Sequence, residues 1–214
     1  MPDELLDIFD DNMRHLGAAP RNEVHEKGLW HQTFHCWLIR REAGKIFVVF
    51  QRRGPDKKVF PNALDITAAG HLVAGESPID GLRELREELG IDASKDDLVP
   101  LGIRCDVAII GSIINREFCH TYLLECKIPL DSLILQADEV TGLVEMELTE
   151  GLDFFCDKRT TARVVGYNID ATGKKHFLDI QISKNDIIPR LDPYYLKIFI
   201  MAERFFQGLK SVGI

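Results

Sequence analysis

The sequence lacks the features of a membrane-spanning or secreted protein. It has no run of roughly eighteen apolar residues, the length that a helix needs to cross a bilayer. Its N-terminal segment, MPDELLDIFDDN, is acidic and unlike a secretory signal. We therefore expect a cytoplasmic protein without a membrane partner.

Cysteines are few and do not form a metal-binding pattern. The five are odd in number and widely spaced, with no zinc-type pair among them: Cys36, Cys105, Cys119, Cys126 and Cys156. This usage favours buried, reduced thiols in a reducing compartment over a disulfide framework.

Positive charge is also in short supply. The chain has 26 Lys and Arg residues against 34 Asp and Glu residues, a net charge of −8. This balance argues against a nucleic-acid polymer as partner. A small nucleotide is still compatible with it, because a metal ion can shield the phosphates.

The length and patterning indicate one domain of mixed α/β structure. The 214 residues contain no internal repeat, low-complexity segment or linker. We expect a core over 30–150, preceded by an N-terminal extension over 1–29 and followed by a hairpin and helix over 151–214. Residue periodicity predicts strands near 4–9, 31–40, 45–52, 64–69, 98–109, 117–127 and 138–147, a tip between two of them at 109–116, a short helix at 149–155 and a hairpin at 161–182.

A last helix is predicted to begin at Pro193. Asp192 is the candidate N-cap for this helix. Its candidate core residues are Leu196, Phe199, Ile200 and Phe205.

Residues 70–91, GHLVAGESPIDGLRELREELGI, carry the strongest functional signal. Ser77 and Asp80 form a capping box before a short helix, and Gly90 is the expected stop. At about 100° per residue, three glutamates fall within roughly 100° of arc, and three leucines face the opposite side. The glutamates are Glu84, Glu87 and Glu88, and the leucines are Leu82, Leu85 and Leu89.

Three carboxylates on one helix face have two interpretations. The first is a solvated acidic surface. The second is a metal site, because the like charges repel and a divalent cation reverses the sign of that interaction. Oxygen ligands suit magnesium, manganese or calcium.

The order of fixed residues favours the metal site. Gly70, Glu76, the Arg83-Glu84-Leu85 run, the Glu87-Glu88 pair and Gly90-Ile91 together resemble the Nudix box, the signature of Nudix hydrolases. One departure is present, since six residues separate Glu76 from Arg83 where the family has seven. We expect the helix register to survive, because burial of the leucines sets it and the missing residue lies upstream.

This resemblance implies a fold, a cofactor and a reaction. The fold is a Nudix-type α/β/α sandwich with a mixed sheet. The cofactor is Mg²⁺ (or Mn²⁺), held by Glu84, Glu87 and Glu88 with the backbone carbonyl of Gly70. The substrate is a small-molecule diphosphate, such as a nucleoside-diphosphate derivative, and the candidate general bases are Glu84 and Glu139. Arg83 either contacts phosphate or orients a box glutamate through an ion pair.

The resemblance extends to one branch of the family. WHQTFHCWLI, the segment from IFVVFQRRGPDKK to the box, and QADEV are similar to isopentenyl-diphosphate isomerase and its hydrolase-like relatives. That isomerase carries a catalytic cysteine directly before the Gly-His of its loop, where this chain has Ala69. Alanine cannot transfer a proton, so hydrolysis is favoured. An isomerase and a non-catalytic ligand-binding module are the alternatives.

The same likeness implies a second metal site. His25, His31, His71 and Glu117 match ligands of the isomerase, and Asn115 stands where its other glutamate would be. The alternative is that these histidines are hydrogen-bonded structural residues.

Two further sets of residues are candidates for substrate contact. Arg52, Arg53 and Lys57, in the segment RRGPDKK, can bind phosphate oxygens or can simply belong to an exposed loop. The aromatic set can stack on a base, line an isoprenoid pocket or pack in the core: Trp30, Phe34, Trp37 and Phe60. The sequence does not determine the oligomeric state, and a homodimer is one of the states it allows.

Overall fold

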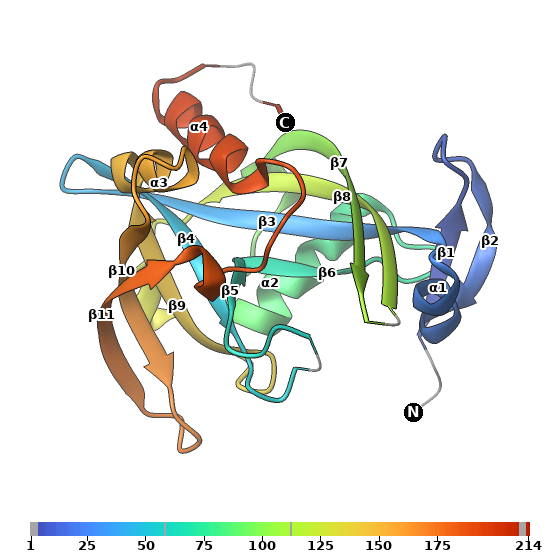
Figure 1. The fold of residues 1–214 in the computed structure, drawn as a ribbon, viewed down its shortest axis with the longest axis horizontal. Helices are drawn as coiled ribbons and strands as arrows, with labels where there is room; N and C mark the ends of the chain where they lie inside the picture. Colours follow the sequence, from blue (N-terminus) through green and yellow to red (C-terminus); the bar gives the residue numbers. More distant parts are fainter. Residues whose placement is uncertain (1–3, 58, 112, 210–212) are drawn as a thin grey trace.

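The fold is a large mixed sheet with helices on both faces (Figure 1). The computed structural model describes residues 4–57, 59–111, 113–209 and 213–214. Within these ranges the strands are β1 (Leu5–Phe9), β2 (His15–Pro20), β3 (Trp30–Glu42), β4 (Lys45–Arg53), β5 (Leu64–Ile66), β6 (Ala68–His71), β7 (Leu98–Ile110), β8 (Ile113–Glu125), β9 (Val140–Glu147), β10 (Thr161–Ile169) and β11 (Lys175–Ser183). The α-helices are α1 (Arg21–Lys27), α2 (Leu82–Leu89), α3 (Leu148–Phe155) and α4 (Tyr194–Phe206).

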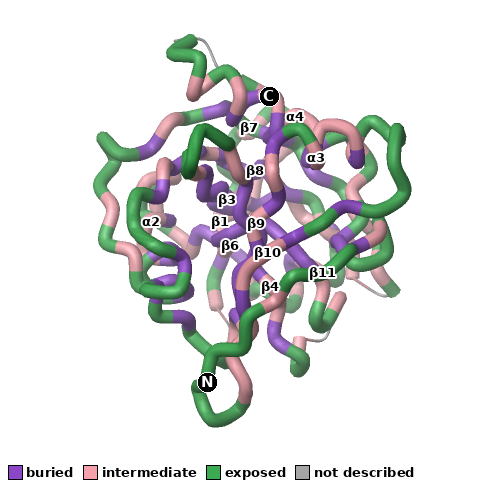
Figure 2. Tube along the Cα trace, turned by 90° about the vertical axis from the view of Figure 1, so that its left-hand side faces the viewer, coloured by how far each residue is buried: buried purple, intermediate pink, exposed green. Residues whose placement is uncertain are grey.

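Strand β3 organises the sheet. It pairs in parallel with β8 and antiparallel with β4 and β6, so the sheet is mixed. The main path runs β11-β10-β9-β4-β3-β1-β2, which places the N-terminal strands and the C-terminal hairpin at opposite ends (Figure 1). Buried segments run along the central strands, whereas exposed turns lie at the periphery (Figure 2).

Two apolar cores explain the layering. One core contains buried residues of α3 and α4, including Phe154 and Phe199, packed against the sheet. The other contains Leu85 and Leu89 of α2. Each helix therefore buries one apolar stripe on its own side of the sheet, and the predicted α/β/α sandwich with a mixed sheet is confirmed.

The predicted strands are present, with one subdivision. The segment 64–69 splits at Thr67 into β5, which pairs with β4, and β6, which pairs with β3. The Thr67 hydroxyl donates to the carbonyl of Val49 on β4 and accepts from the amide of Leu38 on β3. Thr67 thus links β4 to β3 at the point where the chain stops pairing with β4 and begins to pair with β3.

The β7–β8 tip is shorter than the predicted 109–116 turn. The strands extend to Ile110 and resume at Ile113, and residue 112 lies outside the described residues. The predicted hairpin over 161–182 is confirmed as β10 and β11.

Two other expectations need correction. Strand β2 and helix α1 were not predicted. Helix α1 has seven residues and buries only Val24, which is too little for a periodic signal. Asp192 is not the N-cap of α4, since Pro193 takes that position without a side-chain bond. Asp192 instead accepts hydrogen bonds from Arg104 and Lys197.

Of the predicted core residues of α4, only Phe199 is fully buried. Leu196, Ile200 and Phe205 are half-buried. The helix packs through a face that also includes Ile198 and Ala202.

Candidate metal and active site

A cavity of about 950 Å³ brings together most of the predicted site residues. Its walls come from α1, β6, α2, the β7–β8 hairpin and the segment before α4. The predicted residues that line it are His25, Arg53, Lys57, Gly70, His71, Glu84, Glu87, Glu88, Glu117 and Glu139.

The shortened box does not rotate α2. A 3₁₀ turn, Pro78–Gly81, precedes the helix, and the Ser77–Asp80 capping box is present. This capped 3₁₀ turn lies at the shortened junction, directly before the helix. Gly90 ends α2 in a left-handed conformation, as predicted.

The three box glutamates line the same cavity but differ in exposure. Leu85 and Leu89 are fully buried, which confirms the predicted register. Glu84 and Glu88 are only 9% and 6% exposed, whereas the side chain of Glu87 is 55% exposed. Two carboxylates therefore form the inner wall, and the third lies at the rim.

Strand β6 approaches both inner carboxylates through its backbone. A β-carbon at Gly70 would overlap the Glu84 carboxylate, so only glycine allows this approach. The Ala69 amide donates to Oε2 of Glu88 at 3.3 Å. The strand thus fixes the carboxylates next to backbone atoms of the predicted metal site.

Burial makes this site unfavourable for negative charge. Burial and then the neighbouring Glu84 raise the pKa of Glu88 to about 8, and burial also raises the pKa of Glu84. Two adjacent buried carboxylates with raised pKa values are stabilised as anions by a divalent cation. The donor set consists of oxygen atoms and fits Mg²⁺ or Mn²⁺.

Arg83 orients the box rather than facing open solvent. Its guanidinium donates to Glu76 at 3.0 Å, to Glu84 at 2.5 Å and to the His71 carbonyl at 2.8 Å. Glu76 also accepts from the Val73 amide at 2.8 Å. Of the two roles predicted for Arg83, these contacts support ion-pair positioning of Glu84.

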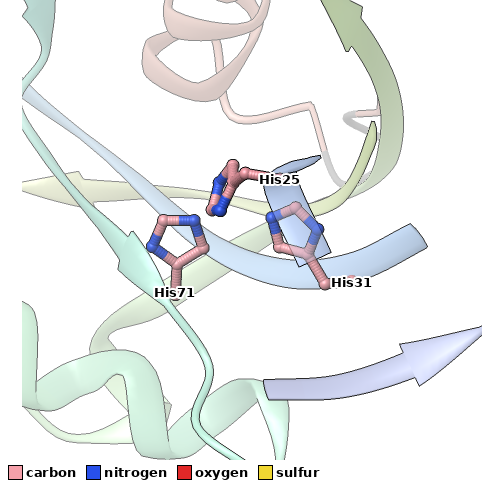
Figure 3. Close-up of side chains that lie close together, drawn as sticks. All are labelled: His25, His31 and His71. Atoms are coloured by element: carbon pink, nitrogen blue, oxygen red, sulfur yellow. The ribbon is translucent and has the colours of Figure 1, made fainter. Parts of the chain in front are cut away.

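The three histidines of the second predicted site are adjacent (Figure 3). Their ring centroids are 5.1 to 5.2 Å apart, and one ring nitrogen of each lies within 4.8 Å of the others. His25 comes from α1, His31 from β3 and His71 from β6. The prediction that His31 and His71 lie close together is confirmed.

Hydrogen bonding leaves these rings free to bind a cation. The Nδ1 atoms of His25 and His31 lie 2.8 and 3.0 Å from backbone carbonyls. Carbonyl acceptors favour the tautomer with a free Nε2. Nε2 of His31 and Nε2 of His71 are buried without a hydrogen-bond partner, and Glu117 Oε1 lies 3.8 and 3.9 Å from them. A metal ion would satisfy these atoms.

Of the predicted basic residues, Arg53 and Lys57 line the cavity and Arg52 does not. Arg53 lines the cavity and donates to Asp65 at 3.2 Å, and Lys57 forms an ion pair with Glu139. Arg52 does not line the cavity and donates to the Asn62 carbonyl. Lys58 lies outside the described residues.

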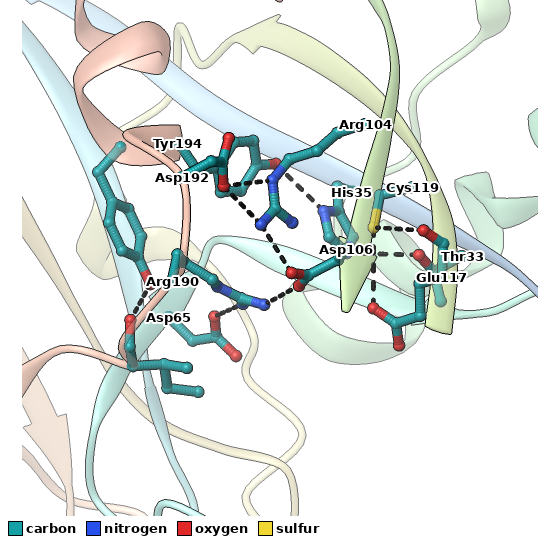
Figure 4. Close-up of polar contacts among 12 residues, drawn as sticks. Thr33, His35, Asp65, Arg104, Asp106, Glu117, Cys119, Arg190, Asp192 and Tyr194 are labelled. Carbon is teal, nitrogen blue, oxygen red and sulfur yellow. Dashed lines mark hydrogen bonds and ion pairs between the residues drawn. The ribbon is translucent and has the colours of Figure 1, made fainter. Parts of the chain in front are cut away.

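An ion-pair network in the cavity wall was not predicted. Arg190, from the segment before α4, donates to Asp65 at 2.9 Å and to Asp106 at 2.8 Å (Figure 4). Arg104 adds bonds to Asp106 and Asp192. These residues come from three distant segments, so no local spacing could have indicated their proximity.

Most of the candidate aromatic residues pack inside the protein. Phe34 and Trp37 are fully buried, and Trp30 stacks on Phe118. Of the four candidates, Phe60 is the one that lines the cavity. An array of aromatic rings for stacking on a base is therefore not formed by this set.

Comparison with known proteins identifies the family. Residues 29–153 match the family model described as the NUDIX domain. The chain therefore belongs to the Nudix family.

Curated relatives agree with this assignment. The chain is 45% identical over 202 residues to an uncharacterized Nudix hydrolase of Clostridium acetobutylicum, covering 94% of this chain and 98% of that protein. It is 32% identical over 160 residues to Nudix hydrolase 3 of Arabidopsis thaliana, covering 72% of this chain and 20% of that protein. It is also 31% identical over 121 residues to an isopentenyl-diphosphate Delta-isomerase of Mycolicibacterium vanbaalenii, covering 56% of this chain and 65% of that enzyme.

Solved structures show the same fold. A Deinococcus radiodurans protein aligns with a TM-score of 0.53 at 21% identity, covering 72% of this chain and 90% of that one. A MutT/nudix family protein of Enterococcus faecalis aligns with a TM-score of 0.52 at 17% identity, covering 82% and 62%. Among the described residues, no helix has the length and apolar character needed to cross a bilayer.

Proposed function

We propose that this Nudix family member is a Mg²⁺- or Mn²⁺-dependent hydrolase of a diphosphate linkage in a small molecule. The substrate class is a nucleoside-diphosphate derivative or a related small diphosphate. The observation that carries the proposal is the pair of buried carboxylates, Glu84 and Glu88, held against the backbone of β6 at Gly70 and Ala69. Such a pair is unfavourable without a cation and suits one that neutralises phosphate charge.

The metal would be held by Glu84, Glu87 and Glu88 with the carbonyl of Gly70. When bound, it supplies charge shielding for the diphosphate and polarises the attacking water. Arg83 positions Glu84 through their ion pair. The exposed side chain of Glu87 leaves the outer edge of the site open to substrate.

Two residues are candidates for the general base. Glu84 has a pKa raised by burial, which makes it a better proton acceptor than an ordinary carboxylate. Glu139 lies across the cavity, next to Lys57. Both carboxylates are ion-paired, Glu84 with Arg83 and Glu139 with Lys57. Glu139 is the stronger candidate, because Glu84 also adjoins Gly70 as a proposed metal ligand.

The basic residues at the cavity support phosphate binding. Arg53 and Lys57 both line it, and burial lowers the pKa of Lys57 while the nearby Arg53 charge lowers it further. A diphosphate would supply the negative charge that this pair favours. Arg52, which lies outside the cavity lining, remains a phosphate-binding prediction supported only by its place in the sequence.

The histidine cluster supports a second metal site. His25, His31 and His71 offer three nitrogens, and Glu117 offers an oxygen. The two unpartnered buried nitrogens fit a cation better than a purely structural role. Imidazole and carboxylate together suit a first-row transition metal.

Isomerisation of isopentenyl diphosphate is the alternative reaction. The similarity to isomerases supports this reaction. However, Ala69 lines the cavity where the resemblance places a catalytic thiol. A methyl group cannot exchange protons with an isoprenoid carbon. A binding module without turnover is the remaining alternative.

A substrate screen tests these possibilities. Purified protein with Mg²⁺ or Mn²⁺ is assayed for phosphate release, with a coupled phosphatase, on nucleotide sugars, dinucleotides, nucleoside triphosphates and isoprenoid diphosphates. We expect turnover that Glu88→Gln abolishes and Glu84→Gln strongly lowers. Glu42→Gln, an exposed surface change, should preserve it. Tight ligand binding without turnover in every class would instead support the binding module.

A further inference from the structure

A second cluster of metal-ligating side chains lies behind Glu117. It consists of His35, Glu117 and Cys119, whose ligand atoms all lie within 4.8 Å of one another (Figure 4). The parallel register of β3 and β8 creates it, because Thr33 pairs with Cys119 and His31 with Glu117. Side chains two residues apart on a strand share a face, so both strands present these groups to the same side.

The separations suit a small four-coordinate metal. Cys119 Sγ lies 3.7 Å from Oε2 of Glu117. Zinc binds sulfur at about 2.3 Å and nitrogen or oxygen at about 2.0 Å, so two ligands on a tetrahedral edge are about 3.5 Å apart. Small side-chain adjustments would complete this geometry.

The hydrogen bonds of His35 favour the ligand tautomer. The Tyr194 hydroxyl accepts from Nε1 of Trp37 at 2.9 Å and contacts the Thr121 side chain. The hydroxyl of Thr121 in turn donates to the Cys119 carbonyl at 3.2 Å, so its oxygen is free to accept the Tyr194 proton. His35 Nδ1, 3.1 Å from the Tyr194 hydroxyl, then carries the ring proton and leaves Nε2 unprotonated. The Thr33 hydroxyl, 3.4 Å from Nε2, is the hydrogen-bond partner that a metal ion would displace.

The two oxygens of Glu117 face different clusters. Oε1 lies 3.8 Å from Nε2 of His31 and 3.9 Å from Nε2 of His71. Oε2 faces Cys119. One carboxylate can therefore bridge the outer histidine cluster and the inner cluster.

We propose that His35 Nε2, Cys119 Sγ and Glu117 Oε2 form a distinct binding site for Zn²⁺ or a similar thiophilic divalent cation. Nitrogen, sulfur and oxygen donors together select such an ion over Mg²⁺. Binding releases the Cys119 thiol proton, and the resulting thiolate and carboxylate balance the charge of the ion. His35 and Glu117 line the large cavity, which provides the entry path.

This site is independent of the proposed hydrolase activity. None of its ligands is a box glutamate of α2. It has one residue, Glu117, in common with the proposed second metal site.

Cobalt spectroscopy tests the inner site directly. Chelator-stripped full-length protein, kept in excess Mg²⁺, is titrated with Co²⁺ as the probe. We expect a near-ultraviolet charge-transfer band from cobalt-bound thiolate, which Cys119→Ala abolishes. The matched control is Cys36→Ala. Cys36, on β3, is as fully buried as Cys119 and belongs to neither metal-ligating cluster. Absence of the band from the unmodified chain, or its persistence in Cys119→Ala, would overturn the proposal.

Zinc stoichiometry provides the second measurement. After equilibration with Zn²⁺ in excess Mg²⁺ and gel filtration, metal content is measured by mass spectrometry. We expect Cys119→Ala and His35→Gln to hold one zinc ion fewer per chain than Cys36→Ala. Circular dichroism restricts the comparison to folded variants, and two differently placed ligands keep the test valid if one variant fails to fold. Equal zinc content in folded variants would contradict the site.

Discussion

Gly70 on β6 lies directly against the carboxylate of Glu84 on α2, in space that any side chain would occupy. This contact joins the strand that leads into the box to the helix that carries its acids. It also explains a glycine at a position without a positive φ, where backbone conformation alone does not require one.

Replacing Gly70 with Ala should therefore displace Glu84. We expect Gly70→Ala to lower kcat at least about 10²-fold, the scale of misplacing a reacting group. Steady-state kinetics across Mg²⁺ concentrations would measure this. The double variant Gly70→Ala/Glu84→Gln should lose less than the product of the single losses, because both changes remove the same interaction. Strictly multiplicative effects would show that the contact has no functional role.

The buried Glu88 predicts how stability depends on pH without metal. Its pKa is about 8 in the folded protein against 4.5 for the unperturbed group. Folding therefore favours the protonated form of Glu88. The stability that this preference contributes is fully present below pH 4.5 and is lost as the pH rises through about 8. In chelator, Glu88→Gln should become more stable than the unmodified chain over this window, by on the order of 2 kcal/mol.

Thermal melts in chelator at several pH values would measure this difference. At the size of this chain, 1 kcal/mol corresponds to about 2–4 °C in Tm. Added Mg²⁺ should abolish the advantage of the variant by stabilising the ionised Glu88. Melting curves of the two proteins that shift in parallel with pH would contradict the prediction.

Lys57 and Glu139 should separate into different kinetic roles. Glu139→Gln should lower kcat by about 10²-fold or more with little change in KM, as expected for loss of a general base. Lys57→Met should mainly raise KM, because its cation lines the cavity proposed to bind the diphosphate. If Glu139→Gln keeps near-normal kcat, the base role passes to Glu84.

The protein should not isomerise isopentenyl diphosphate, because Ala69 lines the cavity at the position where the resemblance to the isomerase places a catalytic thiol. Incubation with Mg²⁺ and Mn²⁺, followed by chromatographic detection of dimethylallyl diphosphate, tests this. Formation of that product well above a no-enzyme control would require another acid-base pair in the cavity.

Arg190 should stabilise the fold as well as the cavity wall. Arg190→Leu leaves the buried Asp65 and Asp106 with one fewer partner each, so we expect a loss of about 3 kcal/mol in the free energy of unfolding. Arg163→Leu is the matched control, because its two bonds to Asp179 are exposed and solvent-screened and should contribute much less. Urea denaturation of both variants would show the difference, and equal losses would contradict it.

The sequence alone was sufficient for the box helix and for most of the sheet. Leu85, Leu89 and the glutamates lie within one short segment, where helical geometry relates spacing directly to direction. The strands follow from alternating patterns of the same local kind. The resemblance added His25, His31, His71 and Glu117 as a group, although no local spacing connects them.

Only the tertiary structure decided how distant segments meet. Helix α1, which positions His25, is too short to produce a periodic signal, and Asp192 bonds to Arg104, 88 residues away, instead of capping its own helix. The inner His35–Cys119 cluster depends on the parallel register of β3 with β8, and Arg190 reaches Asp65 across 125 residues. Local rules describe the free energy of neighbouring residues, whereas these contacts arise from packing of the whole chain, which no single segment encodes.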